Sequence, residues 1–116
     1  MPIADSEKIV VPAGTTVTKT VSFETLGGKS VLLLVNLSAG AGSLVVQVNG
    51  DSAEGYSWGI LTSSSLSGTG TTVLRISPDL SASANVTAKD IVPPTVQVVA
   101  TVTGTLTYGI DASLGS

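Results

Sequence analysis

The feature that most constrains the fold is a series of short Val-, Leu- and Thr-rich runs separated by glycine and serine. Residues 16–23 alternate polar and apolar side chains, with Val17, Val21 and Phe23 on one face, which is the period of a half-buried strand. Residues 30–37 form a nearly continuous Val and Leu run, which predicts a central strand buried on both faces. We find no credible helix, so the chain is expected to be all-β.

The rest of the chain continues this pattern. Further strands are predicted at residues 44–49, 56–61, 71–76, 96–103 and 105–112. Residues 38–43 are predicted as a flexible turn, and Gly104 as the centre of a tight hairpin. The irregular stretch 77–94 is predicted as a long connection with a short strand at 85–87. About seven to eight antiparallel strands around one aliphatic core indicate a single-domain β-sandwich or a small barrel.

Composition argues against an enzyme. Histidine and cysteine are both absent, so disulfides, thiolate metal sites and most acid–base catalysis are excluded. Gly55 to Gly59 match the G-x-S-x-G pattern of a nucleophile elbow, but there is no histidine to act as the base. Gly28-Lys29-Ser30 resembles the end of a phosphate-binding loop, yet Phe23 stands where that motif needs its first glycine. We therefore expect no catalytic residues and no cofactor.

Two weaker candidate sites have plainer interpretations. Asp51 and Glu54 share one loop and could contribute to a calcium site, but a solvated acidic turn is the commoner outcome, so no metal is expected. Tyr56, Trp58 and Tyr108 could form a sugar-stacking platform, although the alternation around Ser57 favours core positions for them.

The charge content bears on possible partners. Only 11% of the 116 residues are charged, and eight acidic residues outnumber five basic ones. Nucleic-acid binding has no support, because there is no basic cluster to neutralise phosphates. The longest apolar run, Val31 to Val35, is too short to span a bilayer, so no membrane partner is expected. A weakly charged surface suits a protein that remains docked on another protein.

The N-terminal segment differs from the remainder. Residues 1–12 are predicted to be an arm with a short apolar edge strand, Lys8 to Pro12, and residues 13–116 the β-sandwich domain. An edge strand of this kind can pair with its own sheet or with another subunit.

Four segments carry a resemblance to a known group: residues 31–38, 44–58, 73–78 and 94–108. In these the chain resembles small all-β virion structural proteins of tailed bacteriophages, of the capsid decoration or cement type. The resemblance implies a protein made in the bacterial host cytoplasm that binds the major capsid protein on the outside of the virion, as a homotrimer at sites of local threefold symmetry. It implies no catalytic residues.

Apolar residues of the arm and of the proline-rich loop are the predicted contacts with the partner: Ile3, Ile9, Val10, Val11, Ile91, Val92, Pro93 and Pro94. The alternative function is a carbohydrate- or receptor-binding β-sandwich module of a fibre or adhesin, or a tail or connector component. Exposure of Tyr56 and Trp58 would favour the carbohydrate-binding alternative, and burial would favour core positions.

Overall fold

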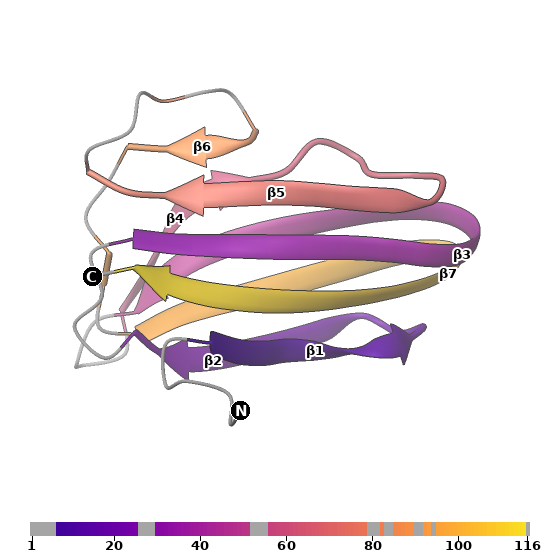
Figure 1. The fold of residues 1–116 in the computed structure, drawn as a ribbon, viewed down its shortest axis with the longest axis horizontal. Coiled ribbons are helices and arrows are strands. Elements are labelled where there is room, and N and C mark those ends of the chain that lie inside the picture. The colour runs from indigo at the N-terminus through magenta and orange to yellow at the C-terminus, as the bar shows by residue number, and fades with distance from the viewer. Residues whose placement is uncertain are drawn as a thin grey trace.

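The computed structural model describes residues 7–25, 30–51, 56–78, 82, 85–89, 92–93 and 95–115 (Figure 1). The strands are β1 (Glu7–Thr15), β2 (Lys19–Glu24), β3 (Ser30–Asp51), β4 (Ser57–Thr62), β5 (Gly70–Ile76), β6 (Thr87–Ala88) and β7 (Thr95–Gly115). The prediction of an all-β chain is confirmed. Within the described ranges there is no helix, and hence none that could cross a membrane.

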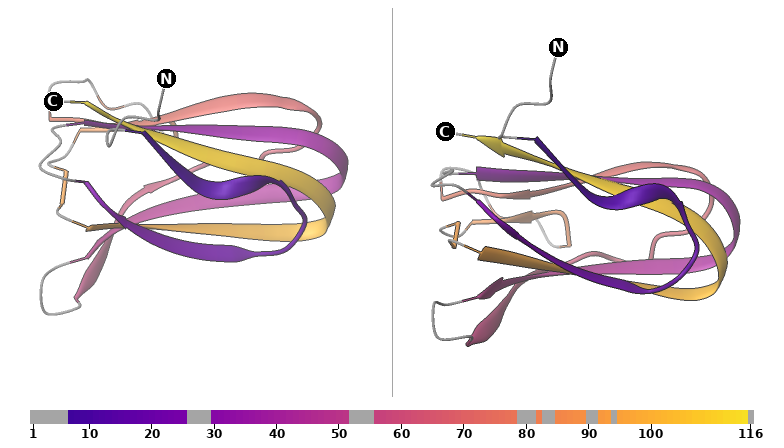
Figure 2. Two further views of the ribbon diagram at one scale, coloured as in Figure 1. Left: turned by 60° about the horizontal axis from the view of Figure 1, so that its bottom comes forward. Right: turned by 90° about the horizontal axis from the view of Figure 1, so that it is seen from below.

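Two long strands organise the molecule. β3 and β7 pair antiparallel over their whole lengths, from Ser30↔Gly115 to Asp51↔Thr95, and both bend midway (Figure 2). The first half of β3 and the second half of β7 form one layer with β1, β5 and β6; the other halves form a second layer with β2 and β4. The predicted β-sandwich is therefore one sheet folded over on itself, and the two-residue contact between β5 and β6 is its one parallel pairing among the described strands.

The predictions of a turn at 38–43 and of a tight hairpin at Gly104 are wrong, because both segments are bent but continuous strand. Gly42 pairs with Gly104 at the bend, and Gly40, Gly42 and Gly104 all have positive φ values, at 100°, 125° and 87°. A Cβ atom at Gly42 would collide with the carbonyl oxygen of Thr103. The glycines thus allow two paired strands to bend together and to stay paired through the bend, with one irregularity between Leu37 and Ala39.

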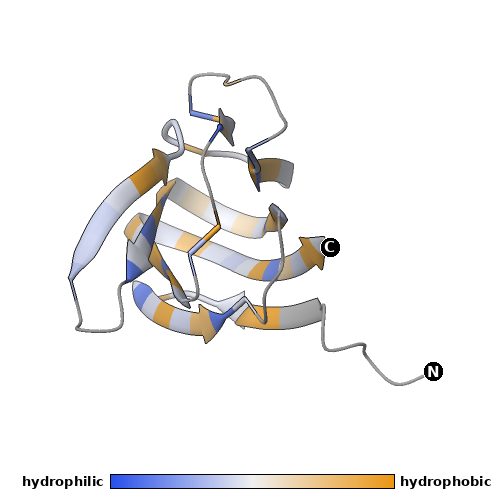
Figure 3. Cartoon of the chain, turned by 90° about the vertical axis from the view of Figure 1, so that its left-hand side faces the viewer, coloured by the Kyte–Doolittle hydropathy of each residue, from blue (hydrophilic) through white to orange (hydrophobic). Residues whose placement is uncertain are grey.

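The core lies between the two layers. Leu106, Tyr108 and Ile110 are all buried, as their alternation predicts, and the Tyr108 hydroxyl donates a 2.8 Å hydrogen bond to the carbonyl oxygen of Val17. Hydrophobic and hydrophilic residues alternate along the strands in the view of Figure 3. The other buried hydrophobic residues are Val10, Val11, Val31, Leu33, Val35, Leu37, Leu44, Val46, Val48, Leu61, Leu74, Ile76, Val96, Val98, Ala100, Ala112 and Leu114.

Residues 30–37 are central in the sheet, between β5 and β7, but they are not buried on both faces as predicted. Val31, Leu33 and Val35 point into the core, whereas Leu32 is half-buried and Leu34 is 39% exposed. The run is apolar on both faces, yet no second layer covers its outer face in the described part of the chain.

The strand predicted over residues 16–23 begins later, at Lys19. Val21 and Phe23 pack against the core, as their spacing predicts. Val17 instead lies in the turn between β1 and β2 and is 55% exposed. Its backbone carbonyl is fixed by Tyr108, so the turn is tied to the core through the main chain.

Ser63 extends the pairing of β3 beyond the end of β4. Its backbone N–H donates to the Val46 carbonyl at 2.8 Å, and its Oγ accepts from the Val46 N–H at 2.9 Å. Ser63 is 4% exposed. Replacing it by alanine leaves the Val46 N–H without an acceptor, so we expect Ser63→Ala to cost about 1–3 kcal/mol of unfolding free energy. Urea unfolding measures this loss, with Ser64→Ala at the neighbouring exposed position as the control.

Candidate interaction surfaces

Neither the G-x-S-x-G motif nor the Gly-Lys-Ser motif has the local structure that its chemistry needs. Ser57 lies on β4, with a strand in place of the strand-to-helix turn of a nucleophile elbow, and Ser30 opens β3 where a phosphate-binding loop needs a helix. No group of three potential metal-ligating residues occurs in the described part of the chain. Asp51 is half-buried at the end of β3, and its predicted companion Glu54 lies outside the described residues.

The arm residues predicted as contacts have different environments. β1 runs across the predicted boundary at residue 12 and pairs with β7. Val10 is 4% exposed and Val11 is fully buried in this chain's own core, whereas Ile9 is 63% exposed. An irregularity in the pairing between Ile9 and Val11 lets two consecutive valines face inward. Ile3 lies outside the described residues.

The loop residues predicted as contacts are only partly described. Pro93 is buried, and its carbonyl oxygen accepts a 2.7 Å hydrogen bond from Thr25 Oγ1. Val92 is partly buried against the core. Ile91 and Pro94 lie outside the described residues. The described part of this loop therefore closes the end of the core beside β2.

A row of four side chains crosses the outer face of the first layer. Ile9 pairs with Asp111, Asp111 pairs with Leu34, and Leu34 pairs with Val73. Neighbours of this kind have Cβ atoms about 4.5–5.5 Å apart. Leu32 lies next to Leu34 on the same face, since every second residue of a strand points to the same side. We call the surface made by Ile9, Leu32, Leu34 and Val73 the Leu34 face.

Two charged residues of opposite sign, Arg75 and Asp111, share this side of the sheet with the Leu34 face. Arg75 pairs with Leu32 across β3 and β5, and Asp111 separates Ile9 from Leu34; both charged side chains are exposed. Because they are exposed, these charges retain their hydration and restrict the apolar surface to a stripe. Arg75 lies at the border of the apolar residues, whereas Asp111 lies within the row, between Ile9 and Leu34.

The favoured core assignment of Tyr56 and Trp58 is wrong. Tyr56 is 72% exposed and Trp58 40% exposed, whereas Tyr108 is 1% exposed and belongs to the core. The alternation around Ser57 is present, but β4 is an edge strand and Trp58 lies near its beginning, where the sheet ends. Edge position, which periodicity does not reveal, keeps these rings at the surface.

Trp58 is held against the backbone of its neighbouring strand. It pairs with Gly50, and a Cβ atom at Gly50 would lie 2.5 Å from Trp58 Cζ2 and 2.8 Å from both Cε2 and Cη2. This Cβ position is at similar distances from three consecutive ring atoms. If it lay in the plane of the ring, it would be much farther from Cε2 and Cη2 than from Cζ2, so it lies above the face of the ring. The indole therefore lies flat over Gly50, a packing that compensates for the missing side chain.

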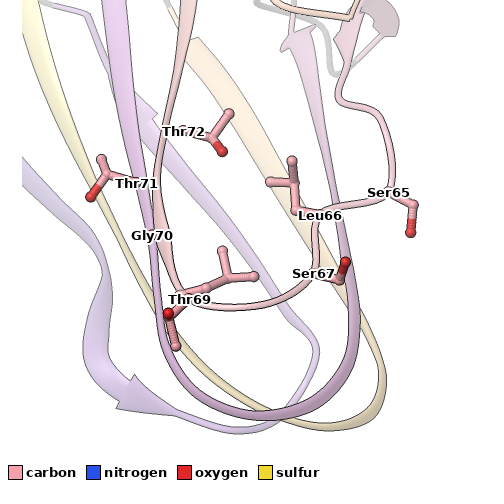
Figure 4. A pocket seen from close by; sticks show the side chains of 8 residues that line it. Ser65, Leu66, Ser67, Thr69, Gly70, Thr71 and Thr72 are labelled. Atoms are coloured by element: carbon pink, nitrogen blue, oxygen red, sulfur yellow. The ribbon is translucent and has the colours of Figure 1, made fainter.

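The chain also forms an open pocket of about 310 Å³ near the bend, between β4 and β5 (Figure 4). Its lining residues are Leu37, Ser65, Leu66, Ser67, Thr69, Gly70, Thr71 and Thr72. The hydroxyl groups of Ser65 and Thr71 point to opposite sides of the loop. Because these hydroxyls do not converge, the pocket lacks the arrangement of polar groups that fixes a small ligand.

With its fold and surfaces described, the chain is an all-β protein with the architecture of a folded-over β-sandwich. No protein-family model matches this chain, and no curated protein matches it.

Sequence reasoning missed Leu34 as a surface residue because it lies in a run that reads as buried on both faces. The sequence signal for an outward face was Asn36, a polar residue that is exposed. Asn36, Leu34 and Leu32 are every second residue of the strand, so their side chains point to the same face. The place of Asn36 in the run indicates which face points outward. No sequence signal predicts that the Trp58 ring packs on Gly50, because that contact depends on the register between β3 and β4.

Proposed function

We propose that this chain is a bacteriophage virion structural protein that binds the outside of the capsid and stabilises the assembled shell. Its partner is the major capsid protein, and the docking surface is the Leu34 face together with the N-terminal arm. The resemblance to decoration proteins suggests the partner, and the uncovered Leu34 face supports a docking role. The exposure of Ile9 at 63%, beside two valines anchored in the core, is the observation that carries the proposal.

The anchoring of β1 is what makes Ile9 useful as a contact. Val10 and Val11 are fixed in the core, so the neighbouring Ile9 is held in position before any partner binds. A side chain that is already ordered loses less conformational entropy on binding. Leu34 lies in the middle of the sheet and is restrained by strands on both sides. The Leu34 face is therefore preorganised for association.

The assembled shell is stabilised because binding of this protein is thermodynamically linked to assembly. A subunit that touches neighbouring capsomers adds contacts to the assembled shell and none to free capsid subunits, so its binding free energy favours assembly. If the protein binds as a homotrimer at a local threefold site, three linked contacts act together and their combined affinity exceeds that of one. Such binding needs no catalytic group.

The proposal predicts that a charge on the Leu34 face blocks capsid binding. Leu34→Asp and Ile9→Asp each place a carboxylate in the docking surface, and we expect each to lower occupancy on purified shells at least tenfold because a buried charge is left unpaired. Co-sedimentation of the variants with shells of the phage that encodes the chain measures occupancy. Val17→Asp is the matched control, because Val17 is 55% exposed in the turn between β1 and β2, outside this face.

Removal of residues 1–6 tests the arm separately. This truncation ends before β1, so it preserves the buried Val10 and Val11, whereas removal of residues 1–11 would also take both valines from the core. We expect the short truncation to weaken binding with little change in the free energy of unfolding. Full occupancy of Leu34→Asp on shells, at the level of Val17→Asp, would contradict the proposed docking surface.

A further inference from the structure

The aromatic pair, Tyr56 and Trp58, forms a second exposed surface on another layer of the sheet. We propose that this pair binds a neutral carbohydrate chain, with the indole of Trp58 stacked on a sugar ring and Tyr56 extending the contact. Trp58 lies on the edge strand β4 of the second layer, and Tyr56 directly precedes that strand. The Leu34 face belongs to the first layer. This binding activity goes beyond capsid docking and is independent of it.

Trp58 presents a flat surface to the solvent. One face of its indole lies over Gly50, and 40% of the residue remains exposed near the end of the sheet, so part of the planar ring is open to the solvent. The backbone beneath the ring restricts its rotation, because turning the indole inward would drive it into the strand. Ligand binding therefore costs little of the ordering entropy that a freely rotating side chain would lose.

A sugar ring suits such a surface. The C–H bonds on one face of a pyranose make that face apolar, while the hydroxyl groups stay at the rim. An exposed indole can cover the apolar face without taking the hydroxyls out of water, and its negative π face attracts the polarised C–H bonds. Tyr56, which is 72% exposed and two residues away, adds a second ring with a polar hydroxyl.

The surroundings of the pair favour a carbohydrate over a protein partner. Gly50, which pairs with Trp58, has no side chain, and the other exposed large hydrophobic residues of the described part, Ile9, Val17, Leu34 and Val86, lie on other segments. A protein interface of ordinary size has a contiguous apolar centre, whereas the exposed apolar surface of this described segment is confined to the two aromatic residues. The chain carries eight acidic and five basic residues, and this net negative charge disfavours anionic glycans.

Affinity electrophoresis with the full chain tests the proposal. The gels contain a soluble neutral polysaccharide, either hydroxyethylcellulose or galactomannan, or polygalacturonate as the anionic comparison. We expect at least one neutral gel to retard the protein and polygalacturonate to have no effect. Trp58→Ala should lower the affinity at least tenfold, and Tyr56→Ala severalfold. Val86→Ala is the control, because Val86 is likewise 40% exposed but lies beside β6.

Intrinsic fluorescence provides a second readout, because Trp58 is the only tryptophan. Titration with cellohexaose or mannohexaose should shift the emission of the native chain to shorter wavelength as the sugar displaces water from the indole. Trp58→Phe should restore part of the retardation lost in Trp58→Ala, since a smaller ring still stacks. Circular dichroism of each variant checks that the fold is retained.

The outcomes separate this proposal from capsid docking. Leu34→Asp should bind glycans like the native chain and fail only on shells. The absence of retardation in every neutral gel would overturn the glycan site, as would equal retardation of Trp58→Ala and the native chain. If Trp58→Ala loses occupancy on shells and the native chain binds no glycan, the pair is a protein-docking surface and the proposal is wrong.

Discussion

Gly42→Ala is expected to destabilise the protein more than any other single methyl addition, by roughly 3–5 kcal/mol of unfolding free energy. Two effects combine at this position. The φ angle of Gly42 is 125°, a region that residues with a Cβ atom rarely adopt, and the added Cβ would collide with the carbonyl oxygen of Thr103. Thr103 belongs to the paired strand β7, so relief of the collision must separate β3 from β7 at the bend.

Two other glycines allow these effects to be separated. Gly68 also has a positive φ, 77°, but a Cβ there meets nothing within 4 Å, so Gly68→Ala should show only the conformational cost of about 1–2 kcal/mol. Gly59 has neither constraint, since its nearest contact would be Asn49 Oδ1 at 3.8 Å. Urea unfolding of all three variants measures the series. Equal stability of Gly42→Ala and Gly68→Ala would mean that the strands do not meet closely at the bend.

Tyr108→Ala should produce a loss of similar size, roughly 3–5 kcal/mol, because Tyr108 is the largest fully buried side chain. Tyr108→Phe keeps the ring and removes the hydroxyl that donates to the Val17 carbonyl at 2.8 Å, so it should cost only about 0.5–1.5 kcal/mol. Thermal unfolding by circular dichroism measures both variants. A loss in Tyr108→Phe as large as that in Tyr108→Ala would contradict this division between packing and hydrogen bonding.

Tyr108 also predicts how stability changes at alkaline pH. Burial raises the pKa of the Tyr108 hydroxyl above its usual value, because the phenolate loses hydration inside the protein. The folded state therefore holds this proton more tightly than the unfolded state does. Its contribution is fully present below the unfolded pKa of about 10 and is lost as pH rises through the higher folded pKa. Tyr108→Phe should weaken the decline in stability above pH of about 10.

The strands were largely predictable from the sequence, and their connections were not. Alternation depends on one strand at a time, so Leu106, Tyr108 and Ile110 were placed correctly in the core. The glycines at the bend have the same local signature as those of a hairpin turn. Only the pairing of Gly42 with Gly104 distinguishes the two, because it requires both long strands to bend at the same place.

The candidate surfaces were less predictable, because exposure depends on what covers a strand. Leu34 and Leu33 are adjacent and chemically identical, yet one is 39% exposed and the other 1%. Trp58 follows the alternation of a core residue and is exposed because β4 is at the edge of the sheet. Ile9 was predicted as a contact together with Val10 and Val11. The irregularity in the pairing of β1, which leaves Ile9 exposed and turns the two valines into the core, cannot be predicted from the residue types.

We propose that the chain acts by docking its Leu34 face on a phage capsid. Electron cryomicroscopy of particles of the phage that encodes it, with the protein bound, tests this claim most directly. We expect density for a β-sandwich on the outer surface of the shell, with the layer of β1, β3, β5 and β7 against the major capsid protein and Ile9 and Leu34 in the contact. Particles without such density, or with that layer facing the solvent, would contradict it.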